Sequence, residues 1–312
     1  MAKAYATVLK DIGTGFQTIG RGAESAAAFE AETGASCRPG GIIAALEAVG
    51  SAPHAAIIAI DIPELCATAR ALMDAGCRRI LLEKPGGLDG GEIESLANAA
   101  KAAGADIRLA YNRRFYGSIL AAREGLMEDG GATSMVFDFT ENADAIAALG
   151  YPHAVLDNWL LANSTHVIDT AFHLAGEPVE WTARVGGKLD WHPRAARFAG
   201  HGVTARNVQF AYSADWDAPG RWSIEIASRK RRFVLRPMEQ LQVQTRGNFA
   251  LEPSAVDALD SAFKPGLHRQ TRAFLTGEGE ADLPDIHQHL HRVRTIYEPM
   301  VQPALIHARG QS

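Results

Sequence analysis

The stretch Ile80-Leu81-Leu82-Glu83-Lys84-Pro85-Gly86-Gly87 decides how the first half of the chain folds. Its first three residues form an unbroken apolar run, as expected for a strand buried on both faces of a parallel sheet. The strand leads directly into two charges, a proline and two glycines. Ligands of such sheets bind at the carboxyl ends of the strands, so Glu83 and Lys84 mark a candidate binding edge.

The segments around this strand alternate between short apolar runs and longer amphipathic stretches. The pattern predicts strands at 16–20, 55–60 and 107–110 and helices at 24–33, 63–75 and 91–103. Gly34 and Gly76 end two of these helices. Alternation of this kind is typical of βαβ units, so we expect a Rossmann-like domain with a parallel sheet over residues 1–115.

Beyond about residue 130, strands follow one another with few helices between them. The predicted strands are 134–140, 203–212, 221–227, 232–236 and 241–245, and the helices are 164–174 and 286–300. Polar and apolar residues alternate along these strands, which favours an α+β domain with an open antiparallel sheet over residues 116–312. The basic run Arg229–Arg232 is interpreted as a charged hairpin turn.

Composition narrows the class of protein. A chain of 312 residues with 47% hydrophobic and 21% charged residues is long enough for two globular domains. A net charge of −5 argues against nucleic acid as a partner. Three cysteines without a C-x-x-C pair favour neither disulfides nor a zinc site, and no apolar run approaches the roughly 20 residues that span a bilayer. We therefore expect a cytoplasmic protein without a membrane anchor.

Three landmarks now stand in order: Leu82–Pro85 after one buried strand, Tyr111–Tyr116 after the next, and His166–Asp169 before an amphipathic stretch. Over about residues 4–300 they resemble the Gfo/Idh/MocA family of oxidoreductases. The resemblance implies a Rossmann domain for NAD(P) and an antiparallel sheet whose face covers the nicotinamide. It also implies hydride transfer to or from a hydroxyl carbon of a sugar, nucleotide sugar or cyclitol.

The resemblance assigns chemistry to particular side chains. It places Lys84 near the reacting hydroxyl and makes His166 its partner from the second domain. Hydride transfer from an alcohol needs a base, and a lysine near other cations or away from water can have its pKa lowered enough to serve. Asp169 follows His166 by three residues and can share its helix face. The expected catalytic residues are Lys84, His166, Asp169 and Tyr111.

Plainer interpretations of these residues stay open. Lys84 could belong to a surface turn, and His166 could be a packing histidine. Family members commonly carry an aspartate four residues before this histidine, but the residue here is Ala162, which puts a two-residue proton relay in doubt. The histidines at 287, 289 and 291 do not converge on a helix, so we expect solvated side chains rather than a metal site.

A dinucleotide fold should begin with a strand, a G-x-G-x-x-G turn and a helix. The glycines of Gly13–Gly20 have the wrong spacing. The better register makes residues 4–10 the rear of the first helix and 16–20 the second strand, with the first strand upstream of Met1. Either the chain starts late, which we expect, or it is a variant that has lost its pyrophosphate loop.

This register places Arg21 at the end of the second strand, where an arginine suits the extra phosphate of NADP and an acidic residue would favour NAD. We therefore expect NADP in preference to NAD. Arg113 and Arg114 follow a later strand, and either can bind a ligand phosphate or form a structural ion pair. The expected cofactor contacts are Arg21, Ser25, Ile60, Asp61, Glu83, Lys84 and Arg113.

Two function hypotheses follow. The first is an NAD(P)-dependent oxidoreductase with a sugar-like substrate. The alternative is a non-catalytic relative that serves as a binding or scaffold subunit, and the absent glycine turn and Ala162 motivate it. In either case, an apolar exposed sheet face predicts a homo-oligomer.

Overall fold

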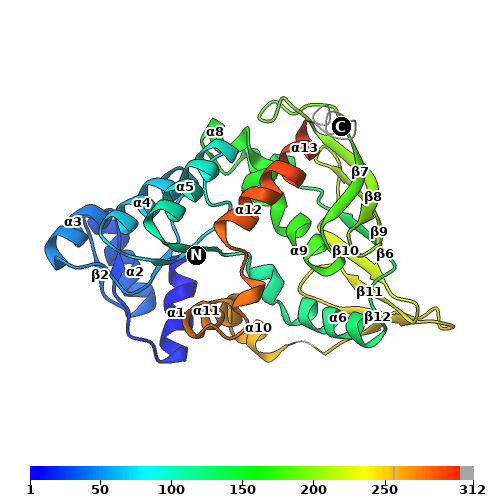
Figure 1. The fold of residues 1–312 in the computed structure, drawn as a ribbon, viewed down its shortest axis with the longest axis horizontal. Coiled ribbons are helices and arrows are strands. Elements are labelled where there is room, and N and C mark those ends of the chain that lie inside the picture. The colour runs from blue at the N-terminus through cyan, green and yellow to red at the C-terminus, as the bar shows by residue number, and fades with distance from the viewer. Residues whose placement is uncertain (256, 303–312) are drawn as a thin grey trace. The chain divides into compact units, whose positions relative to one another are not determined.

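The computed structural model describes residues 1–255 and 257–302, which form two compact units (Figure 1). The first unit contains Met1–Asn112 and Ala262–Leu290, and the second contains Arg113–Ser261 and the residues from His291 onward. We expected the domain boundary after residue 115, with residues 262–290 in the second domain, but these residues belong to the first unit. The segment returns to the first unit because helix α11 (Leu267–Thr276) packs on α1 (Ala2–Ile12).

The first unit alternates strands and helices as the sequence predicts. After α1 its elements are β1 (Thr18–Ile19), α2 (Ala23–Thr33), β2 (Cys37–Arg38), α3 (Gly41–Val49), β3 (Ala56–Ile58), a 3-10 turn (Ile62–Glu64), α4 (Leu65–Asp74), β4 (Arg79–Leu82), α5 (Gly90–Ala103) and β5 (Asp106–Leu109). The return segment adds α11, a 3-10 turn (Glu280–Asp282) and the start of α12 (Ile286–Arg292). Gly34 ends α2 with a φ of 63°, a conformation that glycine adopts without strain.

The strands of the first unit form two separate parallel sheets, β1-β2 and β3-β4-β5. Dinucleotide-binding folds have the strand order 3-2-1-4-5-6. Strands β2 and β1 correspond to positions 3 and 2 of that order, and β3, β4 and β5 correspond to positions 4, 5 and 6. Within the described residues no strand joins β1 to β3. The structure thus has the predicted register, with residues 4–10 in the first helix and the second strand following it.

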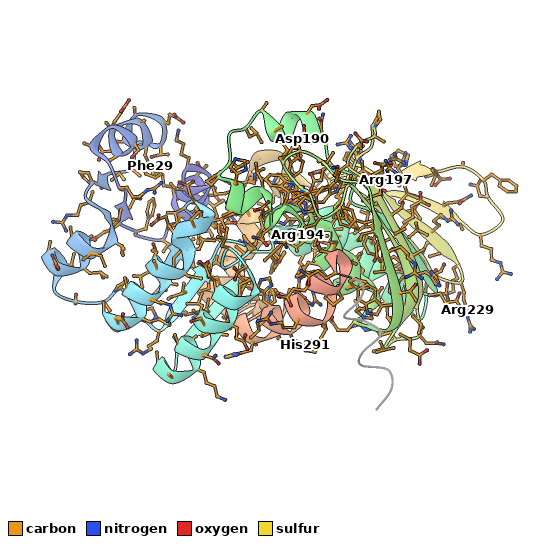
Figure 2. All side chains as sticks on the ribbon, turned by 90° about the horizontal axis from the view of Figure 1, so that it is seen from above. Phe29, Asp190, Arg194, Arg197, Arg229 and His291 are labelled. Carbon is orange, nitrogen blue, oxygen red and sulfur yellow. The ribbon has the colours of Figure 1, made fainter. Side chains whose placement is uncertain are left out.

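Apolar side chains fix both parts of this unit. Ile80, Leu81 and Leu82 of β4 are completely buried, as their unbroken run predicts. A second cluster joins Ala6 of α1 to Phe29 of α2 and Cys37 of β2, and Figure 2 labels Phe29 among the helices of this region. The carboxyl end of β4 is therefore held in place by the packing of its buried side chains.

The second unit is built on an eight-stranded sheet of order β13-β12-β11-β10-β6-β9-β8-β7. Its strands are β6 (Ser134–Asp138), β7 (Pro178–Gly186), β8 (Arg197–Thr204), β9 (Gln209–Asp215), β10 (Ser223–Ala227), β11 (Arg231–Leu235), β12 (Gln242–Thr245) and β13 (Glu252–Pro253). Neighbouring strands are antiparallel except β6 and β9, which pair in parallel, so the sheet is mixed.

The helical elements that accompany this sheet are a 3-10 turn (Asn112–Phe115), α6 (Gly117–Glu128), α7 (Ala143–Ala147), α8 (His153–Leu156), a π-helical turn (Leu160–Ser164), α9 (Thr165–Ala175), α10 (Ala258–Ala262), a second π-helical turn (Val293–Tyr297) and α13 (Glu298–Val301). Of these, α6 contacts β11, α9 contacts β6 and β10, and α13 contacts β7. Phe172 of α9 meets Phe137 of β6 edge-on at 5.6 Å and Phe210 of β9 at 5.1 Å. No described helix is both long and apolar enough to cross a bilayer.

Two strand predictions in this unit need correction. The predicted strand 203–212 is the end of β8, a turn at Asn207 with a φ of 60°, and the start of β9. Strand β7 and most of β8 were not predicted, and in β8 two glycines, Gly200 and Gly202, interrupt the apolar pattern. A Cβ on Gly200 would lie 2.3 Å from the Thr182 carbonyl oxygen, so the close approach of β7 requires glycine there.

The basic run 229–232 lies at a hairpin, as predicted, but only Arg229 and Lys230 are in the turn, because Arg231 and Arg232 begin β11. Figure 2 labels Arg229 at the surface, where it lies between β10 and β11. Arg231 differs from its neighbours because its guanidinium binds Asp129. The run therefore shapes a turn and is not one continuous basic patch.

Helix α6 rests on β11 through a glycine, and this contact predicts the effect of a substitution. A Cβ on Gly125 would lie 2.7 Å from the ring of Phe233, which is 1% exposed. Alanine is normally about 1 kcal/mol better than glycine inside a helix. We expect Gly125→Ala instead to lower the free energy of unfolding by about 1–3 kcal/mol, because the ring cannot move away.

Urea denaturation of Gly125→Ala, Phe233→Leu and the double variant measures this clash. In the double variant the smaller leucine should relieve it, which would appear as a coupling energy of about 1–2 kcal/mol. Strictly additive effects would contradict the proposed contact.

Candidate functional site

The loop Glu83–Gly87 follows β4 and is the best-supported candidate site of the first unit. Lys84 is partly exposed, whereas the other four residues are buried. The Pro85 carbonyl accepts a hydrogen bond from His289 Nε2 at 2.7 Å, and the Gly86 carbonyl accepts one from Cys66 Sγ at 3.2 Å. Gly86 has a φ of 84°. The loop therefore presents one side chain, that of Lys84, from a fixed backbone.

Glu83 turns into the unit and is held there. Tyr5 donates its hydroxyl proton to Glu83 Oε1 at 2.9 Å, and Gln270 Nε2 donates to the Tyr5 oxygen at 2.9 Å. Burial raises the pKa of Glu83, while the Lys84 charge and the hydrogen bond from Tyr5 act in the opposite direction. Burial also raises the pKa of Tyr5 well above its ordinary value, so Tyr5 stays a donor.

The residues expected at the ribose end of a cofactor lie at the ends of β1 and β3. Arg21 Nη2 and Asp61 Oδ2 form an ion pair at 2.5 Å, with side chains 63% and 73% exposed. Ser25 donates to the Gly22 carbonyl at the start of α2. Ile60, next to Asp61, is also exposed. The structure thus brings Arg21 and Asp61 together on the surface of the first unit.

Tyr111 and His289 pack against each other, with ring centroids 5.6 Å apart. Both are completely buried. The prediction that the alternating histidines are solvated is therefore wrong for His289, although His287 and His291 are exposed and Figure 2 labels His291 at the surface. Tyr111 thus packs in the interior of the first unit, and its catalytic role stays a prediction.

Asp169 forms a buried ion-pair network in the second unit. Arg114 Nε and Nη2 each donate to its carboxylate at 2.7 Å, and Arg292 Nη1 donates at 2.5 Å. Burial alone would raise the pKa of Asp169, but the two arginines hold it well below its ordinary value. Its side chain is 0% exposed. The carboxylate thus binds two arginines, which gives Asp169 a structural role in this unit, and its catalytic role stays a prediction.

His166 lies in the first turn of α9, after the π-helical turn that contains Ala162. Its side chain is largely buried, and its ring centroid lies 6.2 Å from that of Trp222. Arg113, expected at the cofactor, belongs to the second unit and stacks its guanidinium 4.7 Å from the Trp222 ring centroid. Trp222 therefore contacts residues from two of the sequence landmarks.

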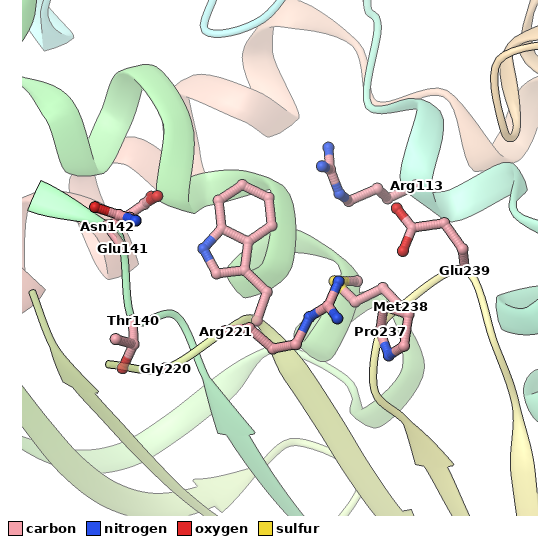
Figure 3. A pocket seen from close by; sticks show the side chains of 10 residues that line it. Arg113, Thr140, Glu141, Asn142, Gly220, Arg221, Pro237, Met238 and Glu239 are labelled. Atoms are coloured by element: carbon pink, nitrogen blue, oxygen red, sulfur yellow. The ribbon is translucent and has the colours of Figure 1, made fainter. Parts of the chain in front are cut away.

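A pocket of about 280 Å³ opens beside Trp222 (Figure 3). It is lined by Arg113, Thr140, Glu141, Asn142, Gly220, Arg221, Trp222, Pro237, Met238 and Glu239. Glu141 is held in place by Ser164 Oγ at 2.7 Å and by Asn163 Nδ2, which lies 3.1 Å from both carboxylate oxygens. The lining combines an aromatic face with charged and amide groups.

Sequence reasoning missed most of this pocket. Arg113 comes from the 3-10 turn, and the other lining residues come from three short loops that follow β6, precede β10 and follow β11. The only indication of this pocket in the sequence was the presence of charged residues at the ends of predicted strands. Among residues 1–255 and 257–302, no group of three His, Cys, Asp or Glu side chains could hold a metal ion.

Comparisons with known proteins identify the fold. No family model matches this sequence, and a search of curated proteins found no match. Solved structures do match. An oxidoreductase from Agrobacterium radiobacter in complex with NAD+, L-tartaric acid and magnesium has a TM-score of 0.73 at 14% identity, covering 100% of this chain and 94% of that chain.

Two further structures carry sugar-related names. UDP-N-acetylglucosamine 3-dehydrogenase GnnA from Acidithiobacillus ferrooxidans has a TM-score of 0.71 at 18% identity, with 96% of this chain and 94% of that chain covered. Levoglucosan dehydrogenase in complex with NADH and levoglucosan has a TM-score of 0.74 at 18% identity, with 98% and 95% covered. Identities this low establish the fold alone. The chain has the fold of these oxidoreductase structures, with a Rossmann-like parallel-sheet unit and a unit built on a mixed sheet, in agreement with the predicted fold class.

The Asp169 network predicts a large loss of stability on substitution. Asp169→Asn removes the buried negative charge that the Arg114 and Arg292 guanidinium groups share, and we expect it to lower the free energy of unfolding by about 3–5 kcal/mol at pH 7. Because the native pKa is lowered, the carboxylate stabilises the fold above its unfolded pKa of about 3.9, and the contribution is lost as pH falls below it. The difference between the variant and wild type should therefore shrink below about pH 4.

Urea denaturation across this pH range measures the effect. Asp61→Asn is the matched control, because its exposed pair with Arg21 is worth less than about 1 kcal/mol. Equal stability of Asp169→Asn and Asp61→Asn at pH 7 would contradict the structural assignment of Asp169.

Proposed function

We propose that this protein is an NAD(P)-dependent oxidoreductase that moves a hydride to or from a hydroxyl carbon of a sugar, nucleotide sugar or cyclitol. The observation that carries the proposal is the loop Glu83–Gly87, where Lys84 alone reaches the surface of a segment that is otherwise buried and hydrogen-bonded. The names of similar structures, which include NAD+ and NADH complexes, support the same reaction class.

Lys84 acts as the acid and base. In the oxidative direction its neutral amine takes the hydroxyl proton, and in the reductive direction its ammonium returns that proton to the oxygen. Glu83 supplies a negative charge that stabilises the ammonium form between these steps. The nicotinamide, when bound, accepts or donates the hydride. His166 is the second proposed catalytic residue, with the role of binding a substrate hydroxyl.

The described residues fit the two ends of a dinucleotide better than its middle. Arg21 and Ser25 suit the ribose end, and Lys84 suits the nicotinamide end. The turn after α1 leads from a helix into a strand, so Gly13 and Gly15 do not form a pyrophosphate cradle at a helix start. Arg21 supports NADP as the preferred form, because a phosphate could displace Asp61 from this exposed ion pair.

The pocket beside Trp222 is the proposed site for the sugar-like group. An indole face packs on the apolar face of a sugar ring, and Glu141, Asn142 and Arg113 offer acceptors and donors to its hydroxyls. His166 neighbours the same indole. A cytoplasmic homo-oligomer completes the proposal.

The alternative is a non-catalytic binding or scaffold subunit. The separation of β1 from β3 and the lack of a glycine cradle among the described residues favour it. The two hypotheses make different predictions for cofactor binding. The oxidoreductase must bind a nicotinamide cofactor, whereas a scaffold subunit need not.

Titration of the 312-residue chain with NADPH and NADH, followed by nicotinamide fluorescence, tests the cofactor. We expect binding of both and tighter binding of NADPH. Arg21→Ala should remove that preference, at a cost of about tenfold in NADPH affinity, because it deletes a phosphate contact worth roughly 1.4 kcal/mol. Asp61→Ala is the matched control and should tighten NADPH binding. Binding of neither cofactor would favour the scaffold.

Initial rates with a panel of sugars, nucleotide sugars and cyclitols test the roles of Lys84 and Trp222. We expect Lys84→Met to lower kcat by about 10²–10⁴-fold, since it removes a general acid and base. Trp222→Leu should chiefly raise the KM for the sugar, because it removes a binding face outside the reacting bond. Unchanged kcat in Lys84→Met would exclude the proposed mechanism.

A further inference from the structure

Two hydrogen bonds hold the residues on either side of Lys84, and both depend on the return segment 262–290. On one side, His289 of α12 donates to the Pro85 carbonyl at 2.7 Å. On the other, Gln270 of α11 donates to Tyr5, which donates to Glu83. This segment contributes no strand to the parallel sheets of the first unit, yet it reaches both neighbours of the candidate acid and base.

Both supports have a defined direction. A carbonyl oxygen only accepts, so His289 Nε2 must carry a hydrogen. The Tyr5 oxygen accepts from the Gln270 amide, so its own proton is free to go to Glu83 Oε1. His289 and Gln270 are 0% exposed, and Tyr5 is 3% exposed. Water cannot replace a lost donor at such positions without rearrangement, so each bond constrains the loop.

The consequence for Lys84 is geometric. A lysine side chain has four rotatable methylene groups, and its amine is placed only as well as its backbone. Misplacement of a reacting group by about 1 Å can cost about 10²-fold in rate. The Cys66 contact to Gly86 adds a third support, but it lies two residues from Lys84 and uses a weak donor.

We propose that His289 and Tyr5 are positioning residues for Lys84, through which the return segment fixes the amine that performs proton transfer. The proposal rests on the function proposed above for its kinetic consequence, but its structural claim concerns the loop alone. His289 contributes no proton to substrate, because its ring is buried against Tyr111.

Matched substitutions separate positioning from packing. His289→Leu keeps the volume and removes the donor, whereas His289→Gln keeps an N–H near the position of Nε2. We expect His289→Leu to lower kcat at least tenfold with the cofactor KM within twofold, and His289→Gln to recover most of that loss. Tyr5→Phe should act like His289→Leu. Equal kcat values for His289→Leu and wild type would overturn the proposal, as would equal losses in the leucine and glutamine variants.

A readout on the unliganded chain does not require activity. Acetylation by a low dose of acetic anhydride at a fixed pH, read by peptide mass spectrometry, reports how freely the Lys84 amine reacts. We expect labelling of Lys84 to be several-fold faster in His289→Leu and Tyr5→Phe than in wild type and His289→Gln. Lys101, exposed at the end of α5, is the internal control and should label equally in all chains.

The two measurements fail separately. Equal Lys84 labelling in every chain would overturn the positioning role, even if the enzyme is active. A wild-type chain with no turnover on any substrate would refute the oxidoreductase, and the labelling ratios would still decide whether His289 and Tyr5 hold the loop.

Discussion

The burial of the Glu83 carboxylate beside Lys84 is the constraint on which the first unit depends. A carboxylate removed from water is costly unless other groups compensate it. Here a hydroxyl from α1 donates to it, an amide from α11 orients that hydroxyl, and Lys84 supplies the opposite charge. Three segments far apart in sequence must therefore meet before the end of β4 is stable.

The second unit also buries a carboxylate, and two arginines compensate its charge. Asp169 is buried between Arg114 and Arg292, and Arg292 also binds Glu177. Such a network adds little net stability compared with apolar packing, but it tolerates no missing member. The network favours one arrangement of the segments that it joins. It connects the segment after residue 112 to α9, which contains His166, and to the final helical region.

The sequence was informative where one local pattern sufficed. The apolar run before Glu83 predicted β4, and Gly34 predicted the end of α2. It failed where a role depends on distant partners. The sequence did not indicate that Asp169 binds Arg114 and Arg292, because these arginines lie 55 and 123 residues away. His289 looked solvated because its neighbours His287 and His291 are polar, whereas its own partner, Pro85, is 204 residues away.

The same distinction explains why the candidate pocket was harder to predict than the candidate lysine. Lys84 lies in a contiguous stretch in which apolar residues, charged residues, a proline and glycines follow each other, and this local pattern indicates a candidate site. The pocket uses one to three residues from each of several strand ends, and Trp222 becomes meaningful only beside Arg113 and His166. A sugar has many hydroxyls and a small apolar face, so its site needs donors, acceptors and one aromatic surface from several directions. A sheet edge with many short loops can provide these groups without any recognisable motif, which is why the sequence predicted the fold and suggested Lys84 as a candidate but did not indicate most residues of this pocket.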